Sequence, residues 1–64
     1  MSYLVDKTLT EIKKILQPPE VLRIIWVDGS PQYIDIDYQP NRINVAVMTN
    51  NNGEWMVIEY FGRY

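Results

Sequence analysis

The chain contains no cysteine and no histidine among its 64 residues. Without cysteine it can form neither a disulfide nor a thiolate metal site, and without histidine it lacks the commonest general base and the commonest metal ligand. Residues 1–64 are enough for one domain, which buries roughly 60% of the surface that its unfolded chain exposes. These absences argue against an enzyme, a metal or a cofactor, and they favour a small binding or inhibitory domain.

An excess of one charge and a long apolar run are also missing. Eight acidic and six basic side chains give a net charge of -2, whereas nucleic-acid binders of this size usually carry a clear positive excess. The apolar runs reach about four to six residues, against roughly 20 for a membrane span. Residues 1–7 lack a signal-peptide pattern, so we expect a cytoplasmic protein or the mature form of a secreted one. We expect a monomer that binds neither nucleic acid nor membrane.

One helical pattern opens the chain. Apolar residues at three- and four-residue spacing predict a helix over residues 9–16. Thr8 and Glu11 form a capping-box pattern at its start, and Pro18-Pro19 stops it because proline removes a backbone donor and restricts the residue before it.

Strand patterns follow the helix. Residues 21–27 are β-branched and aromatic with little alternation, which is typical of a strand covered on both faces, and residues 28–31 form a turn. Residues 42–48 alternate cleanly, and residues 55–61 return antiparallel after an Asn-Gly turn at 49–53. We therefore predict an α+β fold. One helix packs on a small mixed sheet, with a parallel pair joined by a long loop and an antiparallel C-terminal hairpin.

The stretch between the parallel strands, residues 32–40, is ambiguous. Its strand-forming side chains are interrupted by Asp35 and Asp37, and Pro31 and Pro40 bracket it. Prolines at both ends limit ladder hydrogen bonding, so we predict an extended loop that cannot join a sheet interior.

Several side chains of this stretch leave alternatives open. Asp35 and Asp37 are either solvated acids or supporting partners of Arg42, and Arg42 itself is either such a support or an ordinary surface cation. Two carboxylates can also serve a glycosidase or bind a cation, although so short a chain offers little cleft for a substrate. Ile36 is either an anchor for a partner's pocket or a core residue of a misjudged strand. No threonine has a His or Lys partner placed to activate its hydroxyl, so we expect no enzyme.

Three segments carry a family resemblance. They are residues 8–14 in the helix, Ile24-Ile25 in the first strand and Asp37-Tyr38-Gln39-Pro40-Asn41-Arg42-Ile43-Asn44-Val45 at the loop exit. From Val5 to Gly62, these segments and the order of elements resemble the potato inhibitor I family of serine protease inhibitors. The third segment is similar to that family's acidic-aromatic-x-x-(Asp/Asn)-Arg-hydrophobic pattern.

The resemblance implies that residues 29–39 form a protease-binding loop. It places Ile36 in the primary specificity pocket of the protease and Asp37 just after the scissile bond. It also gives Arg42 the role of holding the loop from below by charge-assisted hydrogen bonds, with Asn44 beside it where many members have a second arginine. The residues that the resemblance assigns to the binding loop are Tyr33, Ile34, Asp35, Ile36, Asp37, Tyr38 and Gln39.

The function that the resemblance implies is inhibition of a serine endopeptidase by substrate-like insertion of this loop. Ile36 suggests a protease that accepts aliphatic residues, of the subtilisin-like, chymotrypsin-like or elastase-like kind, and the absence of Lys and Arg from the central loop argues against a trypsin-like one. Asp35 stands where the family usually has threonine. The alternative is a non-inhibitory protein-interaction domain on the same fold.

Overall fold

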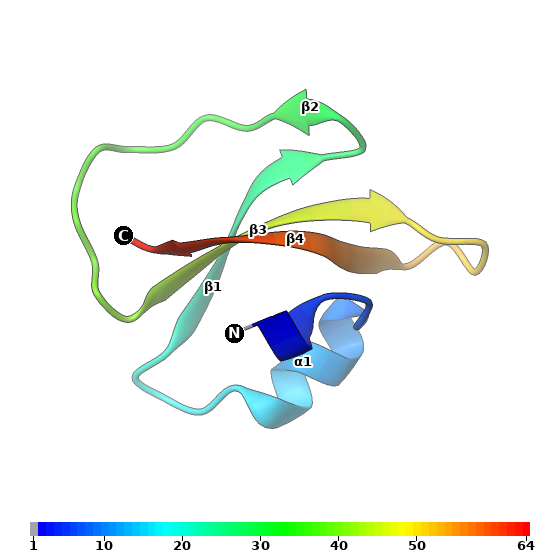
Figure 1. Ribbon diagram of the computed structural model, residues 1–64, viewed down its shortest axis with the longest axis horizontal. Helices are drawn as coiled ribbons and strands as arrows, with labels where there is room; N and C mark the ends of the chain where they lie inside the picture. Colours follow the sequence, from blue (N-terminus) through cyan, green and yellow to red (C-terminus); the bar gives the residue numbers. More distant parts are fainter. Residues whose placement is uncertain (1) are drawn as a thin grey trace.

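A single α-helix, α1 (Leu9–Ile15), precedes the sheet in the computed structural model, which describes residues 2–64 (Figure 1). A short 3-10 helix, η1 (Ser2–Leu4), lies before it. The predicted capping box is present: the Glu11 N–H donates to Thr8 Oγ1 at 3.2 Å, and the Thr8 N–H donates to Glu11 Oε1 at 3.0 Å. The helix ends one residue earlier than predicted, because Leu16 is already extended. The predicted domain of residues 1–64 includes Met1, which lies outside the described residues.

The sheet has four strands in the order β2-β1-β3-β4. They are β1 (Val21–Val27), β2 (Ser30–Pro31), β3 (Arg42–Thr49) and β4 (Trp55–Arg63). β1 and β3 are parallel, whereas β1–β2 and β3–β4 are antiparallel. The prediction of a small α+β fold with a parallel pair and a C-terminal hairpin is therefore confirmed.

β2 was not predicted, because residues 28–31 were expected to form only a turn. Asp28 and Gly29 make a two-residue hairpin loop with φ angles of 50° and 84°, and Ser30 and Pro31 then pair with the end of β1. Two consecutive positive φ angles give the twist that a tight β-hairpin needs, and Asp-Gly is a preferred sequence for it. Pro31 is tolerated here because β2 is an edge strand.

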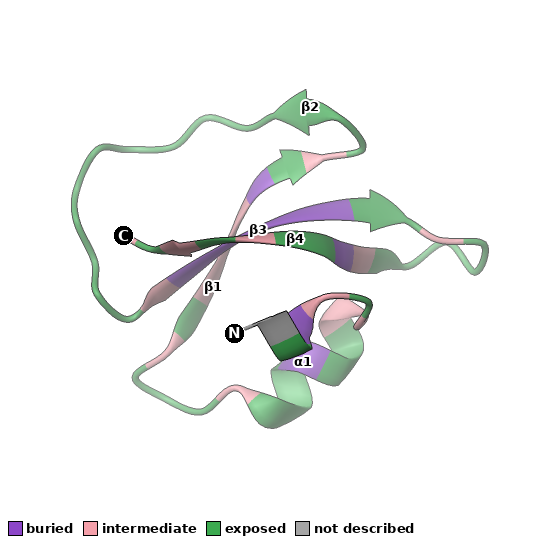
Figure 2. Cartoon of the chain, viewed as in Figure 1, coloured by how far each residue is buried: buried purple, intermediate pink, exposed green. Residues whose placement is uncertain are grey.

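The strand covered on both faces is β3, not β1 as predicted (Figure 2). Within β3, five consecutive residues from Ile43 to Val47 are buried, whereas Ile25 is the one buried residue of β1. The strand order explains this difference. β3 lies between two long strands, whereas β2 pairs only with Trp26 and Val27, so Val21 at the start of β1 has no strand on its outer side and stays exposed.

The hydrophobic core lies between α1 and the sheet. Its fully buried side chains are Leu4, Ile12, Ile43, Val45, Val47 and Val57. Residues 32–41, which we name the connecting segment, join β2 to β3 without helix or strand, and every one of them is exposed. The segment forms a wide arc on the side of the strands away from α1 (Figures 1 and 2). Within residues 2–64, no helix is both long and apolar enough to cross a membrane.

Candidate functional site

Ile36 is the most exposed large hydrophobic residue of the connecting segment. Its exposed fraction is 100%, against 37% for Ile34 and 70% for Tyr38. The alternative that Ile36 belongs to the core of a misjudged strand is therefore wrong. An aliphatic side chain held out in water gains free energy when an apolar pocket covers it.

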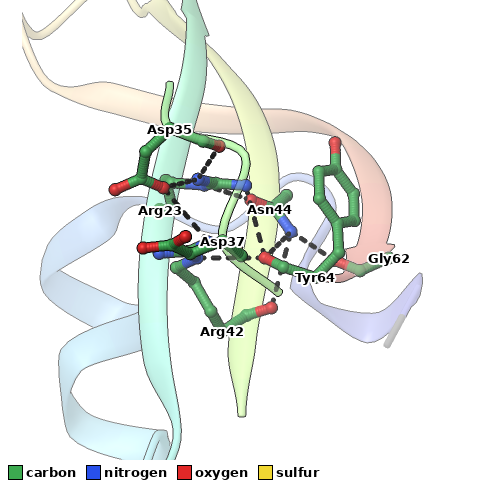
Figure 3. Close-up of polar contacts among 7 residues, drawn as sticks. All are labelled: Arg23, Asp35, Asp37, Arg42, Asn44, Gly62 and Tyr64. Atoms are coloured by element: carbon green, nitrogen blue, oxygen red, sulfur yellow. Dashed lines mark hydrogen bonds and ion pairs between the residues drawn. The ribbon is translucent and has the colours of Figure 1, made fainter. Parts of the chain in front are cut away.

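Arg42, the first residue of β3, reaches under the connecting segment (Figure 3). Its Nη2 donates to the main-chain oxygen of Asp37 at 2.6 Å, and the same nitrogen lies 3.5 Å from the Asp35 carboxylate. Its Nε donates to the main-chain oxygen of Tyr64 at 3.0 Å. The side chain is only 15% exposed. These contacts contradict the alternative that Arg42 is an ordinary surface cation.

Arg23, in the middle of β1, makes a second set of contacts with the segment. Its Nη1 donates to the carboxylate of Asp35 at 3.2 Å and, at 3.4 Å, to the main-chain oxygen of the same residue. Its Nη2 donates to the main-chain oxygen of Tyr64 at 3.3 Å, and its guanidinium carbon lies 5.3 Å from the centroid of the Tyr64 ring. That distance is within the range of a cation–π contact.

Asn44, on β3, connects Arg23 to the end of β4 and to Tyr64. It is fully buried, and its Oδ1 accepts from Arg23 Nε at 2.6 Å. Its Nδ2 donates to the main-chain oxygens of Gly62 at 2.9 Å and of Tyr64 at 3.4 Å. Within residues 2–64, no buried side-chain nitrogen or oxygen lacks a partner. We name Arg23, Asp35, Arg42, Asn44 and Tyr64 the support cluster.

The two acids of the segment differ in their contacts. The Asp35 carboxylate lies within 4 Å of both arginines, although it is 56% exposed. The Asp37 carboxylate makes no hydrogen bond or ion pair with any residue from 2 to 64, and Asp37 is held instead through its main-chain oxygen. Of the two sequence-based alternatives, that of a supporting partner therefore holds for Asp35, and that of a solvated acid holds for the side chain of Asp37. Across the same range, no group of three or more acidic side chains is close enough to hold a metal ion.

Gln39, at the far end of the segment, contributes through its main chain. Its oxygen accepts from the Arg42 N–H at 3.0 Å, which closes the turn into β3. Tyr33, at the near end, is 95% exposed. The segment is thus tied to the sheet around Asp35, Asp37 and Gln39, while its apolar and aromatic side chains face water.

Comparisons with known proteins do not extend this description. No protein-family model matches the chain, and no curated protein or solved structure matches it either. The function is therefore inferred from the contacts of the site.

Two members of the support cluster were missed by sequence reasoning. Arg23 is the one charged residue inside the apolar run of residues 21–27, and that isolation is a signal. In the parallel pair, Arg23 lies opposite Asn44, so the position of one residue predicts that of the other once the register is known. Tyr64 acts through its main-chain oxygen, which carries no signal in the sequence.

Proposed function

We propose that this protein inhibits a serine endopeptidase by placing residues 32–39, the part of the 29–39 stretch that follows β2, in the protease's active site as a substrate would lie. Ile36 enters the primary specificity pocket, and the bond between Ile36 and Asp37 faces the catalytic serine. One observation carries the proposal. A fully exposed isoleucine lies between two residues whose main-chain oxygens are each held from below by a largely buried arginine.

The arrangement favours tight binding because the segment is ordered before the partner arrives. Fixing the backbone of a flexible residue costs roughly 1–2 kcal/mol, and a loop that is free in solution meets this cost when it binds. The arginine contacts at Asp35 and Asp37 reduce that cost in advance. An extended segment with free main-chain groups can then add to the substrate-binding edge of a protease, with side chains entering its pockets.

The same contacts explain how such a loop resists turnover. The serine oxygen of the protease bonds to the carbonyl carbon of Ile36, the carbon–nitrogen bond to Asp37 breaks, and a proton passes to the Asp37 nitrogen. In an ordinary substrate the new amine diffuses away. Here Arg42 holds Asp37 by its main-chain oxygen at 2.6 Å, so the amine stays beside the ester. It can attack the ester carbon, re-form the peptide bond and release the serine.

The target that fits is a protease with an apolar primary pocket. Ile36 suits subtilisin-like or elastase-like enzymes and less closely chymotrypsin-like ones, and residues 29–39 contain no Lys or Arg for a trypsin-like pocket. The exposed carboxylate of Asp37 adds a negative charge immediately after the scissile bond.

A titration of subtilisin, chymotrypsin and elastase with the protein, read with chromogenic substrates, tests the proposal. We expect inhibition of at least one enzyme at or below micromolar concentration, with competitive kinetics. If micromolar protein inhibits none of the three, the proposal is wrong and the non-inhibitory interaction domain takes its place.

A further inference from the structure

The support of the connecting segment comes from two different strands (Figure 3). Arg23 holds Asp35 and Arg42 holds Asp37, the residues immediately before and after Ile36. We infer that Arg23 is the positioning residue for the part of the segment before the Ile36–Asp37 bond, whereas Arg42 positions the part after it. This inference rests on the proposed function. It assigns to β1 a role in presenting the loop that the resemblance places on β3 alone.

The distances separate the two roles. Arg23 Nη1 contacts Asp35 through both its carboxylate, at 3.2 Å, and its main-chain oxygen, at 3.4 Å. Arg42 approaches the Asp35 carboxylate only at 3.5 Å and does not contact the main chain there, and its shortest contact with the segment is to Asp37, at 2.6 Å. Asp35 therefore depends mainly on Arg23, and Asp37 depends on Arg42.

Arg23 is itself held rigidly enough to position another residue. All three of its nitrogens donate: Nε to Asn44, Nη1 to Asp35 and Nη2 to Tyr64. Its side chain is 14% exposed, so solvent and salt screen its part-buried contacts with Asn44 and Tyr64 less than they would screen a surface pair. The planar, five-donor guanidinium can serve these directions at once, which the ammonium of a lysine on the same strand cannot do.

The separate roles of Arg23 and Arg42 matter once the peptide bond between Ile36 and Asp37 has been cleaved. The new end at Ile36 is then joined to the sheet through Asp35 and Arg23 on β1, and the new amine at Asp37 through Arg42 on β3. β1 and β3 are paired, and both arginines donate to the oxygen of Tyr64. The two ends are therefore held in register with each other. Loss of Arg23 frees the first end and lets water reach the ester more often.

NMR relaxation of the backbone amides tests the inference without a protease. Amide order parameters are recorded for residues 34–38 in the wild type, Arg23→Gln and Arg42→Gln. Lys14→Gln is the matched control, because it removes one positive charge from an exposed position of α1, away from the support cluster. We expect values of about 0.85 throughout the wild type and the control. Arg23→Gln should drop residues 34–36 below about 0.6, and Arg42→Gln should act chiefly on Asp37 and Tyr38.

A second variant tests the same contact in case Arg23→Gln does not fold. Asp35 is exposed, so Asp35→Asn should fold like the wild type while it weakens the same ion pair, and it should loosen residues 34–36 as Arg23→Gln does. Folded Arg23→Gln or Asp35→Asn with unchanged order at residues 34–36 would overturn the inference.

The cleavage rate gives the functional readout. Arg23→Gln should raise the rate at which the bound protease cuts between Ile36 and Asp37 by roughly tenfold, as expected for the loss of charge-assisted hydrogen bonds, and Lys14→Gln should leave it unchanged. An unchanged rate in Arg23→Gln contradicts the role of Arg23. If the wild type inhibits no protease, the proposed function fails, and the order parameters still decide whether Arg23 holds the segment.

Discussion

Ile36 contacts nothing that the fold needs, and this separates its effect on binding from its effect on stability. Its side chain is completely exposed, so its replacement should leave the melting temperature unchanged. The residues that hold the segment, in contrast, are buried or nearly so: Asn44 is fully buried, and the Arg23 side chain is 14% exposed. Changes among them should alter stability and loop order together.

Under the proposed function, substitution of Ile36 by lysine should change which protease class the protein inhibits. A residue in the primary pocket sets specificity, so Ile36→Lys should weaken inhibition of elastase or subtilisin by at least roughly 100-fold and produce inhibition of trypsin. Inhibition constants against the three enzymes measure this. Ile34→Lys is the control, two residues earlier in the same segment, and it should not create a trypsin inhibitor. Equal effects of the two substitutions would show that Ile36 is not the anchor.

Removal of the Asn44 side chain should destabilise the fold. Asn44→Ala leaves Arg23 Nε and the main-chain oxygen of Gly62 without their partner in a buried site, which costs about 1–3 kcal/mol. Urea denaturation should report this loss as a lower midpoint with an unchanged slope. Asn51→Ala, at an exposed turn position, is the control and should leave the midpoint in place. A midpoint for Asn44→Ala equal to that of the wild type would contradict the contacts assigned to the support cluster.

The sequence predicted the supporting role of Arg42 but not that of Arg23. Arg42 directly follows the connecting segment in the chain, and the family resemblance of residues 37–45 assigned it this role. Arg23 reaches Asp35 across 12 positions, Asn44 across 21 and Tyr64 across 41. The contact with Asn44 follows from the parallel register of β1 and β3, which no local pattern specifies. The contacts with Asp35 and Tyr64 depend on where the connecting segment and the end of β4 lie.

Among the elements, α1 is the one whose start follows most directly from the sequence. The hydrogen bond from the Thr8 main-chain N–H, followed by that from the Thr8 hydroxyl, lowers the pKa of the Glu11 carboxyl below its ordinary value of 4.5. A lowered pKa in the folded state means that the charged carboxylate stabilises the fold. This contribution is present above the ordinary value and is lost as the pH falls through the folded-state pKa.

Glu11→Gln should therefore change the pH dependence of stability at the start of α1. The amide keeps an acceptor for the capping box but cannot ionise. The wild type should be more stable than Glu11→Gln at pH 7, and the difference should shrink as the pH is lowered below 4.5. Thermal unfolding of both proteins from pH 7 to pH 2 measures it. A difference that does not change with pH would show that the ionised carboxylate contributes nothing to the cap.

The strands show why element boundaries were easier to predict than burial. Alternation and turn residues indicated β3 and β4 to within a few positions, and Asp28-Gly29 marked the end of β1. Which strand is central depends on the order β2-β1-β3-β4, a property of the whole sheet. The apolar run in β1 therefore led to the prediction that β1 is covered on both faces, whereas β3 is the strand covered in this way.

For the whole molecule, the small size and the lack of disulfides place the rigidity of the connecting segment on polar contacts. The core between α1 and the sheet holds β1 and β3, and these two strands carry the arginines that reach the segment. The general fold could be predicted because hydrophobic periodicity determines it. The arrangement of the support cluster could not, since it needs three strands and the residue after β4 in their final positions.

The most direct measurement of the central claim is mass spectrometry of the protein after incubation with an equal amount of an inhibited protease, subtilisin or elastase. We predict one cut, between Ile36 and Asp37, with intact and cut chains both present at equilibrium and both still bound to the enzyme. A main cut at any other bond, or complete degradation without inhibition, would contradict the claim that the support cluster presents Ile36 to a protease.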